Sequence, residues 1–349
     1  MTQTLIIGAG LSGLRVAQAL EAQSKEYQLV DARDRLGGRI NAAHYQGAAF
    51  DLGPAWFWQG QPRIATLINQ LGLQVFEQYA QGDLMYEDGQ GQVQRGQGMS
   101  AMQGSLRVAG GFTALVEALA QSIPQRRIRL KQTATAIRRI EERVEVTFAD
   151  GSIITAERIV FAMPPRLVGD LRFDPVLPDK VTTTFRNVPT WMAGQAKALA
   201  IYDAPFWREA GLSGDAMSRR GPMVEIHDAS AMMDGPYALF GFIGVPPAMR
   251  TDQTALKGAV IEQLGRLFGA QALTPAKFII ADWAQAKETA TQADQMPLMQ
   301  HPVYGFPPAL DNLWDGRLQF AGTEVAQQFG GYLEGALEAA EDVLLRMGE

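Results

Sequence analysis

The sequence contains no cysteine. Disulfide bonds, thiolate metal sites, thiol catalysis and a cofactor tethered through sulfur are therefore excluded. Histidine is scarce, and the three that occur, His44, His227 and His301, lie far apart without the spacing of paired metal ligands on a helix. We therefore expect no metal site.

Long apolar runs are also missing. No stretch approaches the roughly 18 apolar residues of a membrane-spanning helix, and the chain does not begin with the basic, apolar and small residues of a secretory signal. The net charge of −6 argues against a face that binds nucleic acid. We expect a soluble cytoplasmic protein that binds neither membranes nor nucleic acids. Its 349 residues are enough for two or three domains.

The first residues carry a dinucleotide-binding pattern. A short apolar strand leads into Gly8-Ala9-Gly10-Leu11-Ser12-Gly13, a helix follows, and Asp31 ends the next strand about 20 residues on. In this pattern the glycines permit a tight turn, a close backbone approach to a pyrophosphate and close packing of helix on strand. The helix start at Leu11 and Ser12 offers free N–H groups to the anion, and Asp31 accepts a bond from a ribose hydroxyl.

The residues after the second strand indicate which dinucleotide binds. Asp31-Ala32-Arg33-Asp34-Arg35-Leu36-Gly37-Gly38-Arg39 resembles the second signature of the flavin-containing monoamine oxidase family, although the family usually has Glu where Asp31 stands. The resemblance implies FAD as the cofactor. In the family, the arginine that matches Arg39 meets the pyrophosphate, and the glycines keep the backbone close to the ribityl chain.

Further segments resemble the same family in the same order along the chain. They are Asp51–Trp56, Gly110-Gly111, Ala162–Pro165, Lys197–Tyr202 with Pro205–Arg208, Asp282–Ala284, Phe320–Glu324 and Gly330–Ala336. The chain is similar to a short, soluble, bacterial-type member. The resemblance implies that FAD is contacted by Gly8, Gly10, Leu11, Ser12, Gly13, Asp31, Ala32, Arg33, Gly37, Gly38, Arg39, Gly53, Pro54, Ala55, Trp56, Ala134, Ala162, Met163, Pro164, Trp283, Gly322, Thr323, Glu324, Gly331, Tyr332 and Leu333.

The expected fold class is α/β. The resemblance implies a Rossmann-type FAD-binding domain, interleaved with a smaller substrate domain that has a mixed or antiparallel sheet. We expect the FAD-binding domain over 1–76, 107–165 and 281–349, and the substrate domain over 77–106 and 166–280. Residues 77–105 are rich in Gly and Gln and predict a loop-like insertion, where the family has a long helical part. The cavity is then more open, the substrate larger, or a partner subunit covers the site, so a homo-oligomer is possible.

Two residues are expected to act in catalysis. Lys197 is a cation in an otherwise apolar strand. It is either on the solvated face of an alternating strand or, as the resemblance implies, holds a water at flavin N5 and assists the reaction with O2. Tyr332 corresponds to one wall of the family's aromatic cage, which orients an amine. Glycines 330 and 331 open the last helix, whose N-terminus, at Leu333, is expected to face the negative charge of reduced flavin.

The second wall of the cage falls on Ala293, so the cage lacks half of its aromatic surface; Trp56, Trp283 and Phe329 are possible replacements. The family's cysteine attachment site aligns near Gln292, which implies non-covalent FAD. His227 is either a catalytic base or, more simply, a hydrogen-bonded strand residue. His301 is expected in a loop.

Glu334 and Glu338, one helical turn apart, are expected to be solvated.

The resemblance as a whole implies an oxidase that transfers a hydride from an amine to flavin N5. It would release an imine, hence an aldehyde, and hydrogen peroxide, with O2 as acceptor. Two alternatives stay open: a flavin dehydrogenase or desaturase acting on a C–C or C–N bond with another acceptor, and a non-redox FAD protein.

Overall fold

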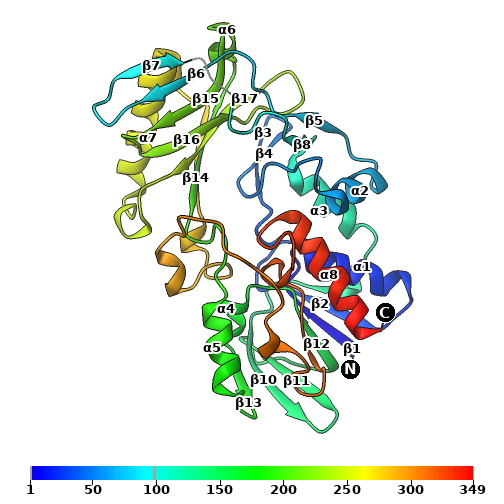
Figure 1. The fold of residues 1–349 in the computed structure, drawn as a ribbon. Coiled ribbons are helices and arrows are strands. Elements are labelled where there is room, and N and C mark those ends of the chain that lie inside the picture. Colours follow the sequence, from blue (N-terminus) through cyan, green and yellow to red (C-terminus); the bar gives the residue numbers. More distant parts are fainter. Residues whose placement is uncertain (1, 97–99, 349) are drawn as a thin grey trace.

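The computed structural model describes residues 2–96 and 100–348, which form two lobes, each built on one large β-sheet (Figure 1). The first sheet runs in the order β9 (Ile128–Arg129), β2 (Tyr27–Val30), β1 (Thr2–Ile7), β12 (Ile153–Phe161), β11 (Arg143–Phe148), β10 (Ala134–Ile140) and β13 (Arg172–Asp174), and β19 (Leu318–Phe320) also pairs with β12. β1 is parallel to β2 and β12, and β11 is antiparallel to β10 and β12. The sheet therefore has a Rossmann-type parallel centre with an antiparallel arm.

Helices cover both faces of the first sheet. One face carries α1 (Leu11–Ala22), α2 (Pro62–Gln70), α3 (Gly111–Ala120) and α8 (Leu333–Met347), whose apolar side chains form one core. Helix α8, red in Figure 1, lies beside α1, blue, although they come from opposite ends of the chain. The other face carries α4 (Pro165–Val168) and α5 (Asp179–Asn187). Because both faces are buried, β1 has an unbroken apolar run rather than an alternating one.

The second sheet, in the upper half of Figure 1, is mostly antiparallel. Its order is β18 (Lys277–Asp282), β14 (Ala196–Tyr202), β17 (Tyr237–Ile243), β16 (Met223–Asp228), β15 (Leu212–Ser218), β6 (Asp83–Glu87) and β7 (Val93–Gly96). Helix α7 (Gln253–Phe268) packs on one face through Val260 and Leu264. The hairpin of β3 (Ala42–Tyr45) and β4 (Ala48–Asp51) packs Phe50 on the other face. Helix α6 (Phe206–Glu209) follows β14.

The prediction of a loop over residues 77–105 is wrong. The described part of this segment contains β6 and β7, and β5 (Val75–Glu77) and β8 (Leu106–Val108) flank it as a separate pair. β6 joins the second sheet parallel to β15, and Glu87 at its end is fully buried, with bonds from Ser218 and Arg266. These partners lie more than 120 residues away, so local sequence pattern carries no signal for the pairing. Residues 97–99 of the predicted loop lie outside the described residues.

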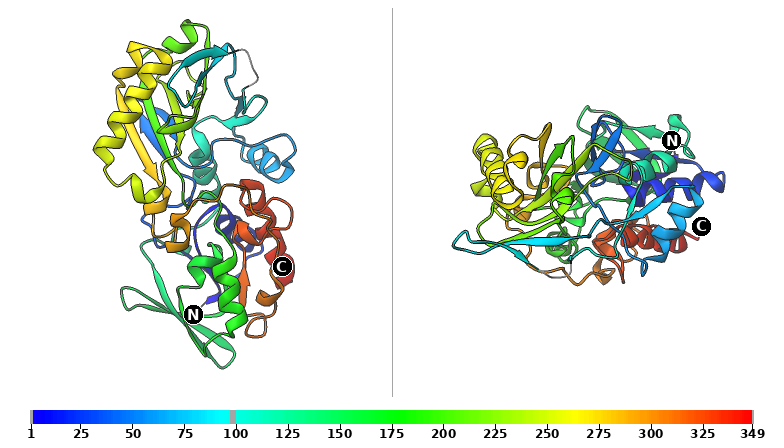
Figure 2. Two further views of the ribbon diagram at one scale, coloured as in Figure 1. Left: turned by 60° about the vertical axis from the view of Figure 1, so that its left-hand side comes forward. Right: turned by 90° about the horizontal axis from the view of Figure 1, so that it is seen from above.

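The predicted domain boundaries stay a prediction. The pairing of β13 with β10 and the packing of Phe185 beside Phe320 place residues 166–187 with the first sheet, and we propose that they belong to the FAD-binding domain. Two further views show the second lobe, yellow and light green, at one end of the lobe that holds both termini (Figure 2). Within the described ranges no helix combines the length and apolarity needed to cross a membrane. The cytoplasmic location also stays a prediction.

Candidate active site

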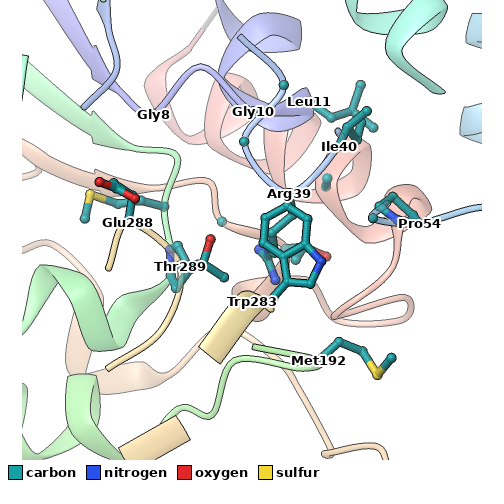
Figure 3. A pocket seen from close by; sticks show the side chains of 18 of the residues that line it. Gly8, Gly10, Leu11, Arg39, Ile40, Pro54, Met192, Trp283, Glu288 and Thr289 are labelled. Carbon is teal, nitrogen blue, oxygen red and sulfur yellow. The ribbon is translucent and has the colours of Figure 1, made fainter. Parts of the chain in front are cut away.

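A cavity of about 770 Å³ extends from the carboxyl ends of β1 and β2 to the second sheet (Figure 3). In open parallel sheets this edge is where ligands bind. All of the residues predicted to contact the cofactor line this cavity except Gly13 and Glu324, and both residues predicted for catalysis, Lys197 and Tyr332, line it too. Gly13 and Glu324 do not line the cavity. Gly13 lets helix α1 pack closely on the turn, and Glu324 places a carboxylate next to Arg39 at the cavity.

Two glycines at the junction of β1 and α1, Gly8 and Gly13, have no room for a side chain. Gly8 has a left-handed φ of 110°, and a Cβ there would lie 2.4 Å from the Ala162 carbonyl oxygen. A Cβ on Gly13 would lie 1.9 Å from the Gly8 oxygen, so the helix packs directly on the turn. Gly10 caps α1 without any side-chain bond, and the first N–H groups of the helix are therefore free at the cavity. Such an uncapped N-terminus binds anions such as a pyrophosphate.

Asp31 is 4% exposed at the end of β2. Its Oδ2 accepts a bond from the Ala9 backbone at 2.7 Å, and its Oδ1 accepts one from the Arg33 backbone at 2.8 Å. A carboxylate has about four acceptor sites, so lone pairs remain for a ribose hydroxyl. Arg33 reaches Thr289 with a 2.6 Å bond, and Thr289 and Glu288 also line the cavity (Figure 3). The sequence reasoning missed these two loop residues, because only the fold brings residue 289 to Arg33.

Arg39 and Glu324 form an ion pair at the cavity wall. Arg39 Nη1 lies 2.7 Å from Glu324 Oε1, and the Glu324 side chain is fully buried while that of Arg39 is 29% exposed. Neither Glu324 oxygen has a partner in hydrogen-bond geometry within the described chain. The buried carboxylate therefore depends on the charge of Arg39, the residue that the sequence assigns to the pyrophosphate.

A second uncapped helix N-terminus faces the cavity. Helix α8 begins at Leu333 after Tyr332, whose side chain makes no capping bond. Thr323 fixes this turn, since its Oγ1 donates to the Tyr332 carbonyl at 2.9 Å and accepts from the Gly331 N–H at 3.0 Å. The positive end of α8 is thereby directed at the cavity, as the sequence predicted.

The prediction that Glu334 and Glu338 are solvated is wrong, because both are buried. Glu334 accepts bonds from the Arg63 and Ile64 backbone at 3.0 and 2.8 Å, and so caps the start of α2. Glu338 accepts bonds from the backbone of residues 327–329 at 2.9–3.0 Å. Both carboxylates therefore accept bonds from backbone N–H groups of a neighbouring segment, and Glu334 does so at the otherwise uncapped start of α2.

Lys197 is 4% exposed, and β14 is buried along its whole length, so the alternative of a solvated strand face is wrong. Its Nζ donates to the Gly53 carbonyl at 2.6 Å and lies 4.3 Å from the centre of the Phe240 ring. Burial lowers the pKa of Lys197 to about 7, although nearby Asp51 acts in the opposite direction. Burial also raises the pKa of Asp51 to about 6, against the effect of Arg107. Lys197 is therefore poised to change charge near neutral pH.

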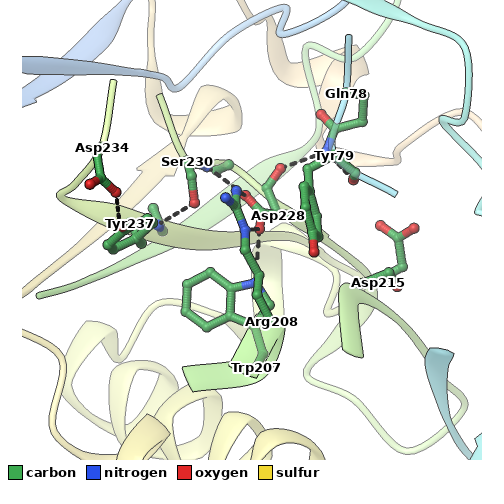
Figure 4. Close-up of polar contacts among 12 residues, drawn as sticks. Gln78, Tyr79, Trp207, Arg208, Asp215, Asp228, Ser230, Asp234 and Tyr237 are labelled. Atoms are coloured by element: carbon green, nitrogen blue, oxygen red, sulfur yellow. Dashed lines mark hydrogen bonds and ion pairs between the residues drawn. The ribbon is translucent and has the colours of Figure 1, made fainter. Parts of the chain in front are cut away.

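Trp56 is held at the cavity by a buried polar network, of which Figure 4 shows the part around Gln78 and Asp228. Its Nε1 donates to Gln78 Oε1 at 2.8 Å, and Gln78 Nε2 donates to the Asp228 carbonyl at 2.8 Å. The Asp228 carboxylate accepts bonds from Trp207 Nε1 at 2.8 Å and Arg208 Nε at 2.7 Å. Asp228 is fully buried, so this network ties Trp56 to the interior of the second lobe.

Asp228→Asn is expected to lower the free energy of unfolding by about 3 kcal/mol, because it removes the charge of a fully buried carboxylate that accepts bonds from Trp207 and Arg208. The matched control is Asp83→Asn, which removes the partner of Arg95 in an ion pair whose side chains are 37% and 51% exposed. This control is expected to cost no more than about 1 kcal/mol. Urea denaturation of both variants measures the difference, and equal losses would contradict the structural role of Asp228.

The aromatic surroundings of Tyr332 differ from those that the sequence suggested. Ala293 and Phe329 are not among the residues that line the cavity, whereas Trp56 and Trp283 are. Trp58, which the sequence reasoning missed, also lines the cavity and lies edge-on to Tyr332, with 6.5 Å between ring centres.

His301 lies in a loop, as expected, but its ring stacks on Tyr332 at 4.8 Å. His227 forms hydrogen bonds with both ring nitrogens, to Asp215 and Glu225, each at 2.8 Å. The structure thus favours the simpler of the two hypotheses for His227, because neither nitrogen is free to act as a base.

These residues fit FAD. The glycine turn at Gly8 admits a dinucleotide backbone, Arg39 and the two uncapped helix starts supply positive charge for phosphates and for a reduced ring, and the buried Glu324 lacks hydrogen-bond donors. The remaining wall is largely apolar and aromatic, as expected around a flavin and a small substrate. Fold and site together define a flavin-binding oxidoreductase.

Comparison with known proteins identifies the family. The model of the flavin containing amine oxidoreductases matches residues 90–344, and that of the NAD(P)-binding Rossmann-like domains matches residues 6–71. The chain belongs to the family of flavin-containing amine oxidoreductases. The resemblance, the fold class and FAD as the cofactor are thereby confirmed.

Two curated relatives illustrate the range of similarity. The probable flavin-containing monoamine oxidase A of Dictyostelium discoideum is 29% identical over 67% of this chain, and the match spans only about half (51%) of that relative. The putrescine oxidase of Kocuria rosea is 21% identical over 97% of this chain and 94% of its own length.

Among solved structures, putrescine oxidase bound to putrescine superposes with a TM-score of 0.81 at 19% identity, covering 100% of this chain and 99% of the other. Cyclohexylamine oxidase from Brevibacterium oxydans IH-35A superposes with a TM-score of 0.83 at 21% identity, covering 99% and 98%. At these identities the structures establish the shared fold.

Proposed function

We propose that this protein is an amine oxidase that uses O2 as electron acceptor and releases an imine, which hydrolyses to an aldehyde, together with hydrogen peroxide. The observation that carries the proposal is Lys197, buried in the cavity wall on the second sheet, opposite the glycine-lined nucleotide site. The substrate class is supported by relatives named for amines, one of them a solved structure with bound putrescine. FAD, when bound, accepts a hydride from the carbon beside nitrogen and passes the electrons on.

The protein's own residues bind and orient the substrate and the oxygen. Trp56, Phe242 and Tyr332 line the cavity and present aromatic surface to the substrate. Lys197 donates from its Nζ to the Gly53 and Asp51 carbonyls, which leaves one N–H of the ammonium group to bind a water or oxygen. A homo-oligomer, non-covalent attachment of FAD and O2 as the natural acceptor stay predictions.

A visible spectrum of the purified protein tests the proposal. We expect flavin absorbance that bleaches when a reactive amine is added without oxygen, returns when air is admitted, and is accompanied by peroxide. Bleaching that returns only with another acceptor, without peroxide, would indicate a dehydrogenase instead. No bleaching by any of a broad panel of amines would overturn the amine oxidase proposal.

A further inference from the structure

The charge of Lys197 is held by the end of β4 and the residues after it rather than by water. Its Nζ donates to the Gly53 carbonyl at 2.6 Å and to the Asp51 carbonyl at 3.4 Å. The ring centres of Phe240 and Phe242 lie 4.3 and 5.4 Å from Nζ. Carbonyls and ring faces attract a cation, whereas burial at 4% exposure opposes one. Whether Lys197 is charged therefore depends on further charges nearby.

This charge decides whether Lys197 offers a hydrogen-bond donor to the cavity. An ammonium group has three N–H donors, and the two carbonyls accept from two of them. The third is then free for a water or an oxygen at the cavity wall. A neutral amine has only two N–H groups, and the same two carbonyls engage both. The donor that faces the cavity is therefore present only while Lys197 is protonated.

The side chain of Asp51 places a negative charge beside these carbonyls. Asp51 ends β4 and is 4% exposed, and its Oδ1 accepts a bond from the Phe112 N–H at 2.9 Å. A Cβ on Gly111 would lie 2.9 Å from the same oxygen, so the carboxylate packs directly on the first turn of α3. The positive end of α3 favours its charged form. Burial raises the pKa of Asp51 to about 6, and the carboxylate is still largely ionised at pH 7.

Arg107, on β8, is a second buried charge in this region. Its Nη1 and Nη2 donate to the carbonyls of Ser230 and Ala229 at 2.7 and 3.0 Å, while its charge attracts Asp51 and repels Lys197. Burial lowers the pKa of Lys197 to about 7, and Asp51 raises this pKa more than Arg107 lowers it. Asp51 therefore has the larger influence of the two on the charge of Lys197.

The carboxylates on the strands near β14 are bound by other residues. Asp282, at the end of β18, lies 2.6 Å from Arg250. Glu225, on β16, is separated from β14 by β17 and lies 2.8 Å from His227. Among the described residues, Asp51 is thus the carboxylate whose charge is left to act on Lys197.

We propose that Asp51 is a positioning residue for the oxygen reaction, whose carboxylate keeps Lys197 in the ammonium form that directs an N–H group into the cavity. This inference rests on the proposed function, because it takes Lys197 to assist the reaction with oxygen. Asp51 itself meets neither oxygen nor substrate. It acts through Lys197, which it holds with its carbonyl and keeps charged with its side chain.

The first test needs neither substrate nor oxygen. In FAD-loaded protein with carbon-13-labelled lysine, the ε-carbon signal that disappears in Lys197→Met reports the titration of Lys197. Asp51→Asn keeps an acceptor for the Phe112 N–H and removes the charge, so the titration midpoint of Lys197 is expected about one pH unit lower. The control Glu87→Gln removes a fully buried carboxylate on β6, outside the cavity, and is expected to leave the midpoint unchanged. An unmoved midpoint in Asp51→Asn overturns the inference.

Lys197→Met gives the same information if Asp51→Asn does not fold. Coupling between two sites is reciprocal, so loss of the lysine is expected to raise the titration midpoint of the Asp51 carboxyl group by a comparable amount. The carboxyl-carbon signal of Asp51 in protein with carbon-13-labelled aspartate measures this shift. A midpoint that is the same in Lys197→Met and in the wild type refutes the coupling and the inference with it.

Stopped-flow reoxidation tests the role in the reaction. The flavin is reduced with one equivalent of dithionite, so the result does not depend on finding an amine substrate. At pH 7 Asp51→Asn is expected to react about 5-fold more slowly than the wild type, because a shift of one pH unit leaves about a tenth of its Lys197 charged instead of about half. At acidic pH, where Lys197 is charged in both proteins, the two rates are expected to converge.

The outcomes separate this inference from the proposed function. If no amine bleaches the flavin but the dithionite-reduced proteins show this pH dependence, the amine proposal fails and the role of Asp51 is supported. If the titration midpoint of Lys197 moves while reoxidation is equally fast at every pH, Asp51 does not serve the oxygen reaction and the inference is wrong.

Discussion

Lys197→Met is expected to slow the reaction of reduced flavin with oxygen by about 100-fold, the loss typical when one preorganised donor is removed from a reacting oxygen. The reason is the position of Nζ, which is buried at the cavity wall and bonded to the Gly53 carbonyl at 2.6 Å. Methionine fills a similar volume without a donor or a charge. Stopped-flow mixing of substrate-reduced protein with aerated buffer measures the rate.

The pH dependence of the same reaction gives a second readout. Burial lowers the pKa of Lys197 to about 7. An ammonium group stabilises negative charge that develops on oxygen, so the wild-type rate is expected to fall as pH rises through about 7. The methionine variant is expected to lose this step. Reoxidation that is equally fast in both proteins would remove Lys197 from the oxygen reaction, provided that the variant still holds FAD.

Arg39→Ala is the second large effect that we expect. In the FAD-free protein it leaves the carboxylate of Glu324 fully buried without its ion-pair partner, which costs about 3–5 kcal/mol of unfolding free energy. FAD affinity is expected to fall about 10- to 100-fold, because a cation at the predicted pyrophosphate site is lost. Urea denaturation of the FAD-free protein and fluorescence titration with FAD measure the two quantities separately.

A double variant separates the two roles of Arg39. Glu324→Gln removes the unpaired charge, so adding it to Arg39→Ala is expected to restore most of the stability. It is not expected to restore FAD affinity, since no cation returns to the site. If FAD binds equally well to Arg39→Ala and to the wild type, Arg39 does not contact the pyrophosphate.

Much of the nucleotide site could be predicted from short segments. The residues predicted at the β1–α1 turn apart from Gly13, those around Gly37-Gly38-Arg39 and those at Gly331–Leu333 line the cavity. At Gly8 the reason is steric, because a side chain would collide with the Ala162 carbonyl. Because the turn requires glycine at fixed positions, the spacing of these glycines can be recognised in the sequence without knowing the fold.

Other predictions failed because their partners lie far away in the chain. The sequence predicts a loop where β6 lies, because the place of β6 beside β15 depends on pairing with a strand about 130 residues later. Glu334 was expected in solvent, but the fold brings the start of α2 against it, 270 residues away. Trp58 was overlooked beside Tyr332 for the same reason. Neither hydrophobic periodicity nor composition indicates which residues so far apart in the chain come into contact.

The sequence by itself determined that this chain folds around a dinucleotide, that the dinucleotide is FAD and that Lys197 is set in an apolar strand. The dinucleotide site and the place of Lys197 follow from backbone sterics and local residue patterns, and FAD follows from the resemblance of residues 31–39 to the flavin-containing monoamine oxidase family. Only the tertiary structure decided what surrounds that lysine, because sheet register aligned Lys197 with Phe242 and Glu225 and packing buried His227 and Asp215 behind them. The cofactor was thus readable from the chain, whereas the surroundings of Lys197 depended on which strands lie side by side.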